Sequence, residues 1–203
     1  MLIQVHPENP EGRKINQIVD CLEKGGIIIY PTDTVYGLGC DIQNQHAVEK
    51  ICRLKKLDPQ KAQLTFICKD ISQVSNFANQ IDNEVFRLIK KNTPGPFTFI
   101  LKSGNEIPKI LKNKKKTIGI RIPDNKIAIA IVEALGRPIL SASLKTDDDI
   151  IEYLTEPEEI AELFEKQVDM IIDGSVGGNV PSALIDCTVM PPELIREGPA
   201  EMR

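Results

Sequence analysis

Residues 25–40 read Gly-Gly-Ile-Ile-Ile-Tyr-Pro-Thr-Asp-Thr-Val-Tyr-Gly-Leu-Gly-Cys, and this stretch decides the fold class. The apolar run 27–30 predicts a buried strand, and Pro31 ends it because proline has no N–H to donate to a sheet. A polar loop follows and is closed by Gly37 and Gly39. A rigid strand that delivers polar residues to one point is how α/β proteins commonly build sites. The same residues also fit a strand-to-helix turn whose hydroxyl groups bond only local backbone, and chemistry alone favours neither interpretation.

The composition is that of a globular protein with an aliphatic core. The chain has 203 residues, of which 41% are hydrophobic, 4% aromatic and 27% charged, and it has no tryptophan. A chain of this length can bury one good core, so we expect a single domain over residues 1–203. The net charge of −4 argues against a protein whose whole surface binds nucleic acid, although it allows a local basic cleft.

The cysteines and histidines do not indicate a metal centre. The five cysteines are scattered without a Cys-x-x-Cys pair, which signals neither a zinc site nor a redox pair. The two histidines are too few and too isolated for a metal site. Free thiols are typical of the reducing cytoplasm, where we expect this protein to be located. We expect no signal peptide and no contact with a membrane, since no apolar run is long enough to span one.

Short apolar runs alternate with helical patterns along the chain. Helices are predicted at 13–24, 45–54, 83–91, 125–135 and 155–166. Asp82 is the expected cap of the third helix, and Thr155 with Glu158 forms a capping-box pattern for the last. Strands are predicted at 2–5, 27–30, 64–68, 97–101, 117–122, 139–141, 168–173, 184–187 and 193–196. The alternation predicts an α/β fold with a twisted mixed sheet, and the acidic connection 145–156 is the best candidate for a mobile loop.

Polar or basic side chains follow several of the predicted strands. They are Thr32, Asp33, Thr34, Thr98, Arg121, Ser141, Ser143, Ser182 and Arg196. Hydroxyl groups and separated cations are what a site needs to hold a carboxylate and phosphates without a metal cage. Each residue alone has a simpler role, such as a surface ion pair for Arg121. The chain has no phosphate loop, no dinucleotide fingerprint and no nucleophile elbow, which disfavours a Ser-His-Asp hydrolase.

The segment 27–38 resembles the opening motif of the YrdC/YciO family, an apolar strand followed by Pro-Thr-Asp/Glu-Thr-x-Tyr-Gly-Leu. Later segments resemble the pattern of the same family in the same order, at 93–101, 117–123, 169–174, 181–186 and 195–198. The best-known members make threonylcarbamoyl-adenylate from ATP, L-threonine and bicarbonate for tRNA modification. The resemblance therefore implies a YrdC-like twisted open mixed sheet, flanked by helices, with a concave basic cleft.

The resemblance also implies roles for individual residues. The residues that would bind L-threonine are Thr32, Thr34, Arg121 and Ser182. Those that would bind ATP or its adenylate are Thr98, Ser141, Ser143 and Arg196. Lys55 matches the family's first lysine and would face phosphate, and Lys61 is a weaker match to a second basic position. Mg²⁺ would accompany the leaving pyrophosphate, and no residue is assigned to a catalytic step or to a resident metal.

Two positions depart from the dedicated synthases. The synthases carry Lys-x-Arg where this chain has Lys55-Lys56-Leu57, and they carry Ser-x-Asn where it has Ser141-Ala142-Ser143. Losing one charged contact to a triphosphate costs on the order of a few kcal/mol. Both departures are typical of the YciO branch, which this chain resembles more closely. We therefore expect a synthase-like protein of weak or altered activity.

Two other functions stay open at this stage. The first keeps adenylate chemistry with another acceptor, similar to the YrdC-type domain of the hydrogenase-maturation carbamoyltransferase. The second, from a different class, is binding of tRNA or double-stranded RNA through a cleft joined to the lysine cluster 109–116. The acidic net charge and the scarcity of aromatic side chains for base stacking weigh against RNA. A degenerate paralogue that binds a nucleotide without turnover is the remaining hypothesis.

Overall fold

The computed structural model describes residues 1–58, 64–112, 114–145 and 153–203. The strands of this part of the chain are β1 (Leu2–Gln4), β2 (Ile28–Tyr30), β3 (Gly37–Asp41), β4 (Thr65–Ile67), β5 (Phe97–Lys102), β6 (Thr117–Arg121), β7 (Ile139–Ser143), β8 (Met170–Asp173), β9 (Ala183–Asp186) and β10 (Glu193–Arg196). The helices are α1 (Gly12–Glu23), α2 (Gln45–Leu54), α3 (Ile71–Phe77), α4 (Asn83–Asn92), α5 (Lys126–Leu135) and α6 (Pro157–Phe164), with a 3₁₀ turn η1 (Lys109–Leu111).

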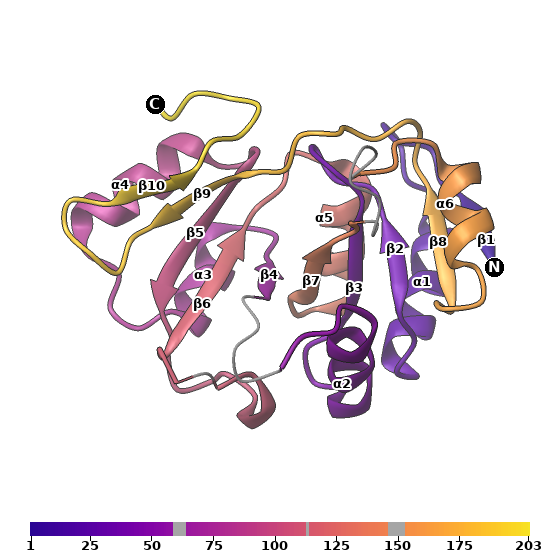
Figure 1. The fold of residues 1–203 in the computed structure, drawn as a ribbon, viewed down its shortest axis with the longest axis horizontal. Helices are drawn as coiled ribbons and strands as arrows, with labels where there is room; N and C mark the ends of the chain where they lie inside the picture. The colour runs from indigo at the N-terminus through magenta and orange to yellow at the C-terminus, as the bar shows by residue number, and fades with distance from the viewer. Residues whose placement is uncertain (59–63, 113, 146–152) are drawn as a thin grey trace.

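Within the described residues, all the strands belong to one sheet in the order β1-β8-β2-β3-β7-β4-β6-β5-β9-β10. The pairs β1–β8, β2–β8, β4–β6 and β5–β9 are parallel, and the others are antiparallel. Figure 1 shows the twist of this open sheet, with the N-terminus near one edge and β10 at the other. The predicted α/β class and mixed sheet are confirmed.

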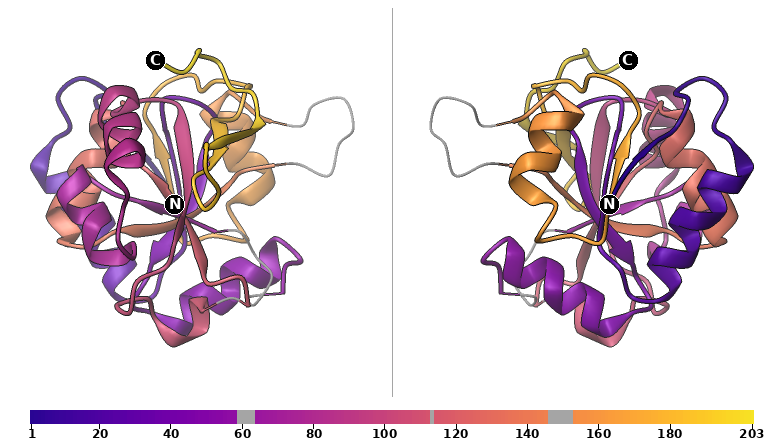
Figure 2. Two further views of the ribbon diagram at one scale, coloured as in Figure 1. Left: turned by 90° about the vertical axis from the view of Figure 1, so that its left-hand side faces the viewer. Right: turned by 90° about the vertical axis from the view of Figure 1, so that its right-hand side faces the viewer.

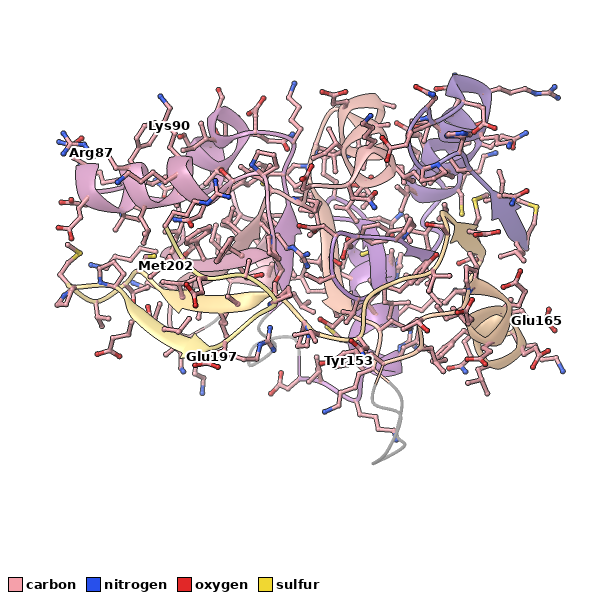
Figure 3. All side chains as sticks on the ribbon, turned by 90° about the horizontal axis from the view of Figure 1, so that it is seen from above. Arg87, Lys90, Tyr153, Glu165, Glu197 and Met202 are labelled. Atoms are coloured by element: carbon pink, nitrogen blue, oxygen red, sulfur yellow. The ribbon has the colours of Figure 1, made fainter. Side chains whose placement is uncertain are left out.

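Helices lie on both sides of the sheet, as Figure 2 shows. In the view from above in Figure 3, Arg87 and Lys90 of α4 lie on one side, whereas Glu165, directly after α6, lies on the other. One buried cluster joins α1 and α5 to side chains of the sheet that include Ile28, Tyr30, Ile67 and Ile139. A larger cluster takes in α2, α3, α4 and α6. The core is aliphatic, as the composition predicts.

Strand β3 corrects one interpretation of the sequence. Gly37 and Gly39 were expected to close a polar loop or a strand-to-helix turn, but they lie in a buried strand that pairs antiparallel with β2 and β7. Glycine has a low strand propensity, so the pattern Gly-Leu-Gly-Cys hides the strand. The Cβ atoms that these positions lack explain the choice: at Gly39 a Cβ would lie 2.8 Å from both Tyr30 Cε1 and Ile139 Cγ2.

The start of α6 also differs from the prediction. The helix begins at Pro157 with Glu156 as its N-cap and without a capping side-chain bond, so the capping box of Thr155 and Glu158 is wrong. Proline is favoured in the first turn because it has no N–H to leave unpaired there. The Thr155 carbonyl instead accepts from Gly177 N–H at 2.8 Å. By contrast, Asp82 caps α4 as predicted, since its side chain accepts from Glu84 N–H.

Three further observations bear on function. All five cysteines are free, and burial raises the pKa values of Cys40 and Cys68. In the ranges that the structure describes, no helix combines the length and the apolarity that crossing a membrane requires. In the same ranges, no group of three or more His, Cys, Asp or Glu side chains is arranged to hold a metal ion. Residues 146–152 of the expected mobile loop lie outside the description.

The packing at β3 predicts that Gly39→Ala destabilises the protein by about 1–3 kcal/mol, because the new methyl group meets buried side chains that have little room to move. Gly12→Ala is the matched control, since a Cβ at Gly12 meets nothing within 4 Å. Its stability should equal or slightly exceed that of the parent. Urea midpoints of the three proteins measure both effects. An unchanged midpoint for Gly39→Ala would refute the close approach of Tyr30 to β3.

Candidate functional site

A cavity of about 190 Å³ lies against one face of the sheet. Directly paired residues of neighbouring strands project to the same face. Ser141, Thr65, Gly119 and Ile100 therefore form one row across β7, β4, β6 and β5, and the pair Gly37–Ser143 lies on the same face, two residues further along β7. All of these residues border the cavity. Apart from Ile100, these side chains are small, and they leave the space that a ligand would occupy.

The structure brings most of the predicted site residues to this cavity. Those that line it are Thr32, Thr98, Arg121, Ser141, Ser143, Ser182 and Arg196. Thr34 lies just behind them, in contact with Arg121. Lys55 lines a neighbouring pocket of about 370 Å³, which shares Ser143 and Arg196 with the cavity. Lys61 lies outside the described residues.

The described charged side chains that line the cavity are cations, and one of them, Arg121, has Asp33 as its counter-ion. Among the described residues that line it, Arg121 and Arg196 are cations and none is Asp or Glu. The neighbouring pocket adds Lys55 and Lys145, again without a described acidic residue. These basic lining residues agree with the concave basic cleft that the family resemblance implies. It can hold anionic groups at two separated points without a resident metal.

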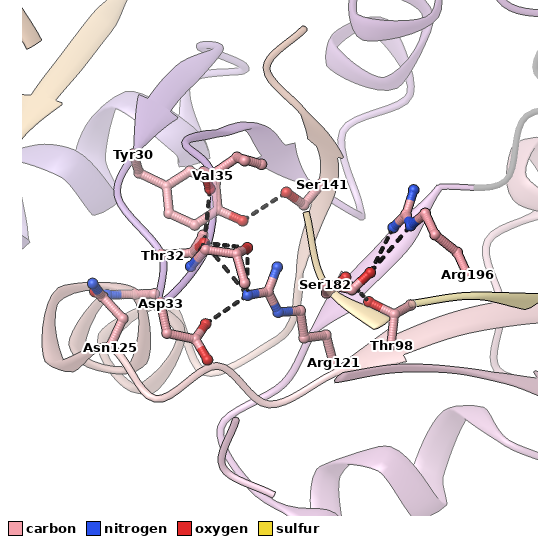
Figure 4. A network of polar contacts seen from close by, with 12 residues as sticks. Tyr30, Thr32, Asp33, Val35, Thr98, Arg121, Asn125, Ser141, Ser182 and Arg196 are labelled. Atoms are coloured by element: carbon pink, nitrogen blue, oxygen red, sulfur yellow. Dashed lines mark hydrogen bonds and ion pairs between the residues drawn. The ribbon is translucent and has the colours of Figure 1, made fainter. Parts of the chain in front are cut away.

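Arg121 is the centre of the first half of the site (Figure 4). Its Nη2 donates to Asp33 Oδ1 at 2.6 Å and to Thr34 Oγ1 at 2.8 Å, with Thr32 Oγ1 at 3.5 Å. The side chains of Arg121 and Asp33 are only 8% and 11% exposed. Because β6 supplies the arginine and the loop after β2 supplies its partners, this ion pair crosses the cleft.

The same pair is incompletely satisfied. Arg121 Nε and Asp33 Oδ2 are buried and have no hydrogen-bond partner among the described residues. A buried polar atom without a partner costs about 1–3 kcal/mol, and such atoms in a native protein often mark a ligand site. No role was assigned to Asp33 from the sequence, although it lies in the opening motif. Its partnership with Arg121 depends on the tertiary fold.

Thr98, Ser182 and Arg196 form the second half of the site. Thr98 Oγ1 and Ser182 Oγ are 2.8 Å apart, and both side chains are buried. Arg196 donates from Nε and Nη2 to the Ser182 carbonyl at 3.2 and 2.8 Å. These contacts join β5, β10 and the residue before β9 into one polar unit. Figure 4 shows Arg121 next to this unit.

The sequence pattern did not mark two tyrosines near the cavity as site residues, because both were expected only as parts of the opening motif. Tyr30 donates its hydroxyl proton to Ser141 Oγ at 2.7 Å. Tyr36 lines the cavity and donates to the Ser175 carbonyl at 2.7 Å, and burial raises its pKa to about 12. The glycine at every second position of β3 is the sequence signal that could have pointed to Tyr30.

The two positions that depart from the synthase pattern both border the cavity. Leu57 is 40% exposed and contributes an apolar wall, and Ser143 contributes a hydroxyl group. By contrast, none of the lysines in the cluster 109–116 lines the cavity, although Thr117 directly after them does. The departures thus affect the site itself, whereas the lysine cluster lies outside it.

A sequence model of the Sua5/YciO/YrdC family, described as telomere recombination, matches residues 20–198. The chain belongs to this family. It is 46% identical over 200 residues to the Escherichia coli K12 protein YciO, covering 98% of this chain and 96% of that protein. It is 32% identical over 174 residues to a threonylcarbamoyl-AMP synthase of Saccharophagus degradans, covering 85% and 90% of the two chains.

Solved structures of Sua5/YciO/YrdC proteins agree with this assignment. The crystal structure of E. coli YciO matches with a TM-score of 0.93 and 45% identity, over 100% of this chain and 98% of that one. The structure of P. abyssi Sua5 complexed with L-threonine matches with a TM-score of 0.88 and 30% identity. That match covers 98% of this chain but 57% of the Sua5 chain. The YrdC-like fold is therefore confirmed, and this family includes a protein that binds L-threonine.

The buried ion pair predicts a test of stability. Arg121→Met should destabilise the protein by about 3–5 kcal/mol, because it leaves Asp33 buried without its partner. Adding Asp33→Asn should recover part of this loss. Lys14→Met, which breaks the exposed Lys14–Glu11 pair, is the control and should leave the urea midpoint unchanged. A double variant as unstable as the sum of its single variants would contradict the pairing.

Proposed function

We propose that this protein is a threonylcarbamoyl-AMP synthase-like enzyme, which joins L-threonine and bicarbonate to the AMP portion of ATP. Its product would serve the t6A modification of tRNA. One observation carries the proposal: a single cavity without described acidic lining residues has a buried, incompletely satisfied arginine at one end and a second arginine with hydroxyl groups beside it. The synthase name of the S. degradans relative and the L-threonine bound by P. abyssi Sua5 support it.

Arg121 would bind the carboxylate of L-threonine. Its Nη2 is held by Asp33 and Thr34, so the plane of the guanidinium is fixed before a ligand arrives. The remaining N–H groups are then oriented toward a carboxylate, which arginine binds in a planar, charge-assisted geometry. Thr32, Thr34 and Ser182 would contact the amine and hydroxyl groups of the substrate. Because little side-chain entropy is left to lose, this end of the site is pre-organised.

The nucleotide would extend toward Arg196. Thr98, Ser141 and Ser143 present hydroxyl groups along the cavity, and Lys55 lines the pocket that continues from it. We assign the triphosphate to this positive path, with ATP bound as its Mg²⁺ complex and the metal arriving with the substrate. Lys61, which follows Lys55 in the chain, is a further candidate for a phosphate contact.

The proposed reaction has two steps. The amine of L-threonine and bicarbonate form a carbamate with loss of water. A carbamate oxygen then attacks the α-phosphorus of ATP, and the bond from phosphorus to pyrophosphate breaks. No side chain in the cavity need form a covalent bond, so catalysis would rest on positioning and on neutralising the phosphate charge.

Leu57 and Ser143 favour a variant of this function. An arginine replaced by leucine and an asparagine replaced by serine weaken the hold on the triphosphate without closing the cavity. The protein would then turn over slowly, or its true acceptor would differ from L-threonine while the adenylate chemistry is retained. RNA binding would need a basic path from the cavity to residues 109–116, and none of those lysines lines the cavity.

Calorimetry with L-threonine, bicarbonate and MgATP tests the proposal. Arg121→Lys should weaken L-threonine binding about 10- to 100-fold, because a lysine cannot reproduce the planar pair of hydrogen bonds. Arg137→Lys is the control, since Arg137 pairs with the buried Asp41 away from the cavity. It should cost stability but not affinity. ATP binding that L-threonine does not affect would indicate another acceptor. The absence of nucleotide binding would contradict the proposal and favour RNA binding instead.

The departures from the synthase pattern make a second prediction. Leu57→Arg combined with Ser143→Asn should raise adenylate formation about tenfold or more, because each change restores a polar contact to the phosphates. Incorporation of labelled bicarbonate into the adenylate measures the rate. Lys14→Met, remote from the cavity, is the control. A double variant that folds but gains no activity would show that these positions do not limit the reaction.

A further inference from the structure

Tyr30 lies outside the set of residues that the proposed function uses, yet its hydroxyl group reaches the cavity wall. It is the last residue of β2 and is 0% exposed. Its Oη is 2.7 Å from Ser141 Oγ on β7. Strands β2 and β7 are not neighbours, because β3 runs between them. The tyrosine ring therefore crosses a whole strand to reach Ser141, as Figure 4 shows.

Two glycines in β3 make this crossing possible. Tyr30 is paired with Gly37, and Gly39 is paired with Ser141, so these residues project to the same face. A Cβ at Gly37 would lie 3.0 Å from the Tyr30 ring and 3.0 Å from Ser141 Oγ, and a Cβ at Gly39 would lie 2.8 Å from the ring. Any larger residue at either position would push the ring away. The contact is thus built into the strand between the two partners.

The direction of the hydrogen bond follows from what surrounds it. The Tyr30 hydroxyl has no other acceptor among the described residues, so a proton pointing elsewhere would be buried without a partner. Burial raises the pKa of Tyr30 to about 12, which keeps the group protonated. Ser141 Oγ therefore accepts from Tyr30. Since a serine hydroxyl has one proton, Ser141 keeps that proton free to donate into the cavity.

We propose that Tyr30 is a positioning residue that fixes the Ser141 hydroxyl as a donor toward the cavity, where it selects an anionic phosphate oxygen of the ligand. The identity of the ligand as a nucleotide rests on the proposed function. Without Tyr30, the Ser141 hydroxyl can rotate and turn a lone pair toward the phosphate, which repels it. The β3 glycines then serve the site as well as the fold.

The effect of Tyr30 should appear only through Ser141 and only for phosphorylated ligands. Tyr30→Phe keeps the ring in its place over Gly37 and removes the hydroxyl alone. We expect this variant to bind MgATP about five- to tenfold more weakly and to bind adenosine unchanged. In a Ser141→Ala background, which alone lowers ATP affinity, the same change should have no further effect. Thr93→Val is the control, since it removes a hydroxyl bond to the Ile89 carbonyl outside the cavity.

The parent, Tyr30→Phe, Ser141→Ala and the double variant are each titrated calorimetrically with MgATP, pyrophosphate and adenosine. The twelve affinities test whether Tyr30 acts through Ser141 on phosphate binding. Equal losses from Tyr30→Phe with and without Ser141, or a loss shared by adenosine, would overturn the positioning role. If Tyr30→Phe does not fold, Ser141→Ala must still weaken the binding of ATP and leave the binding of adenosine unchanged. An equal loss of affinity for both ligands would overturn the proposal. A parent protein that binds adenosine but neither ATP nor pyrophosphate would refute the phosphate assignment. A parent that binds none of the three would refute the proposed function as well.

Discussion

The buried ion pair between Arg121 and Asp33 is the interaction on which the site depends. It joins the end of β6 to the loop after β2, and β3, β7 and β4 lie between these strands in the sheet. Bringing both charges out of water is expensive, and their attraction offsets that only when geometry and further hydrogen bonds are good. Here the pair fixes the loop of the opening motif over the row of small residues that forms the cavity floor.

A second ion pair, between the half-buried Arg137 and the buried Asp41, differs from the Arg121–Asp33 pair in how well its atoms are satisfied. Arg137 donates from Nε and Nη2 to the two carboxylate oxygens of Asp41, and from Nη1 to the Leu135 carbonyl. Asp41 Oδ1 also accepts from the Gln43 N–H. That pair is satisfied by the protein alone and links the end of β3 to the start of β7. The Arg121–Asp33 pair keeps unpaired buried atoms, and it is the one that borders a cavity.

The side chains at the two ends of the cavity differ in how many hydrogen bonds hold them in place. At the Arg121 end, the cation and hydroxyl groups are held by short bonds and a buried carboxylate. At the other end, Leu57 and Ser143 are exposed at the cavity, in the part where the proposed function would place the phosphates. The pocket can persist when Leu57 or Ser143 changes, because the residues that shape its floor are those that pair the strands. Tyr30 and the β3 glycines both pair the strands and shape the wall of the cavity.

The sequence by itself determined the local elements and the chemistry of the site. Caps such as Asp82, apolar periodicity and proline stops act over a few residues, so the helices α1, α2, α4 and α5 could be predicted, as could most strands. The polar residues after the strands, together with the opening motif, also pointed to most of the polar and charged side chains that line the cavity. Strand β3 was not predicted, because glycine has a low strand propensity. Its glycines are needed there because the Tyr30 ring packs against them, and that contact cannot be read from local propensity.

Only the tertiary structure decided which of these residues meet. The order of strands in the sheet differs from their order in the chain, so Arg121 meets Asp33 and Ser182 meets Thr98 across 88 and 84 residues. The same strand order left Lys55 in a neighbouring pocket and the lysines of 109–116 outside the cavity, although they lie close in sequence to residues that line it. Side-chain type is local, but convergence depends on strand pairing, and pairing follows from burying the whole sheet at once.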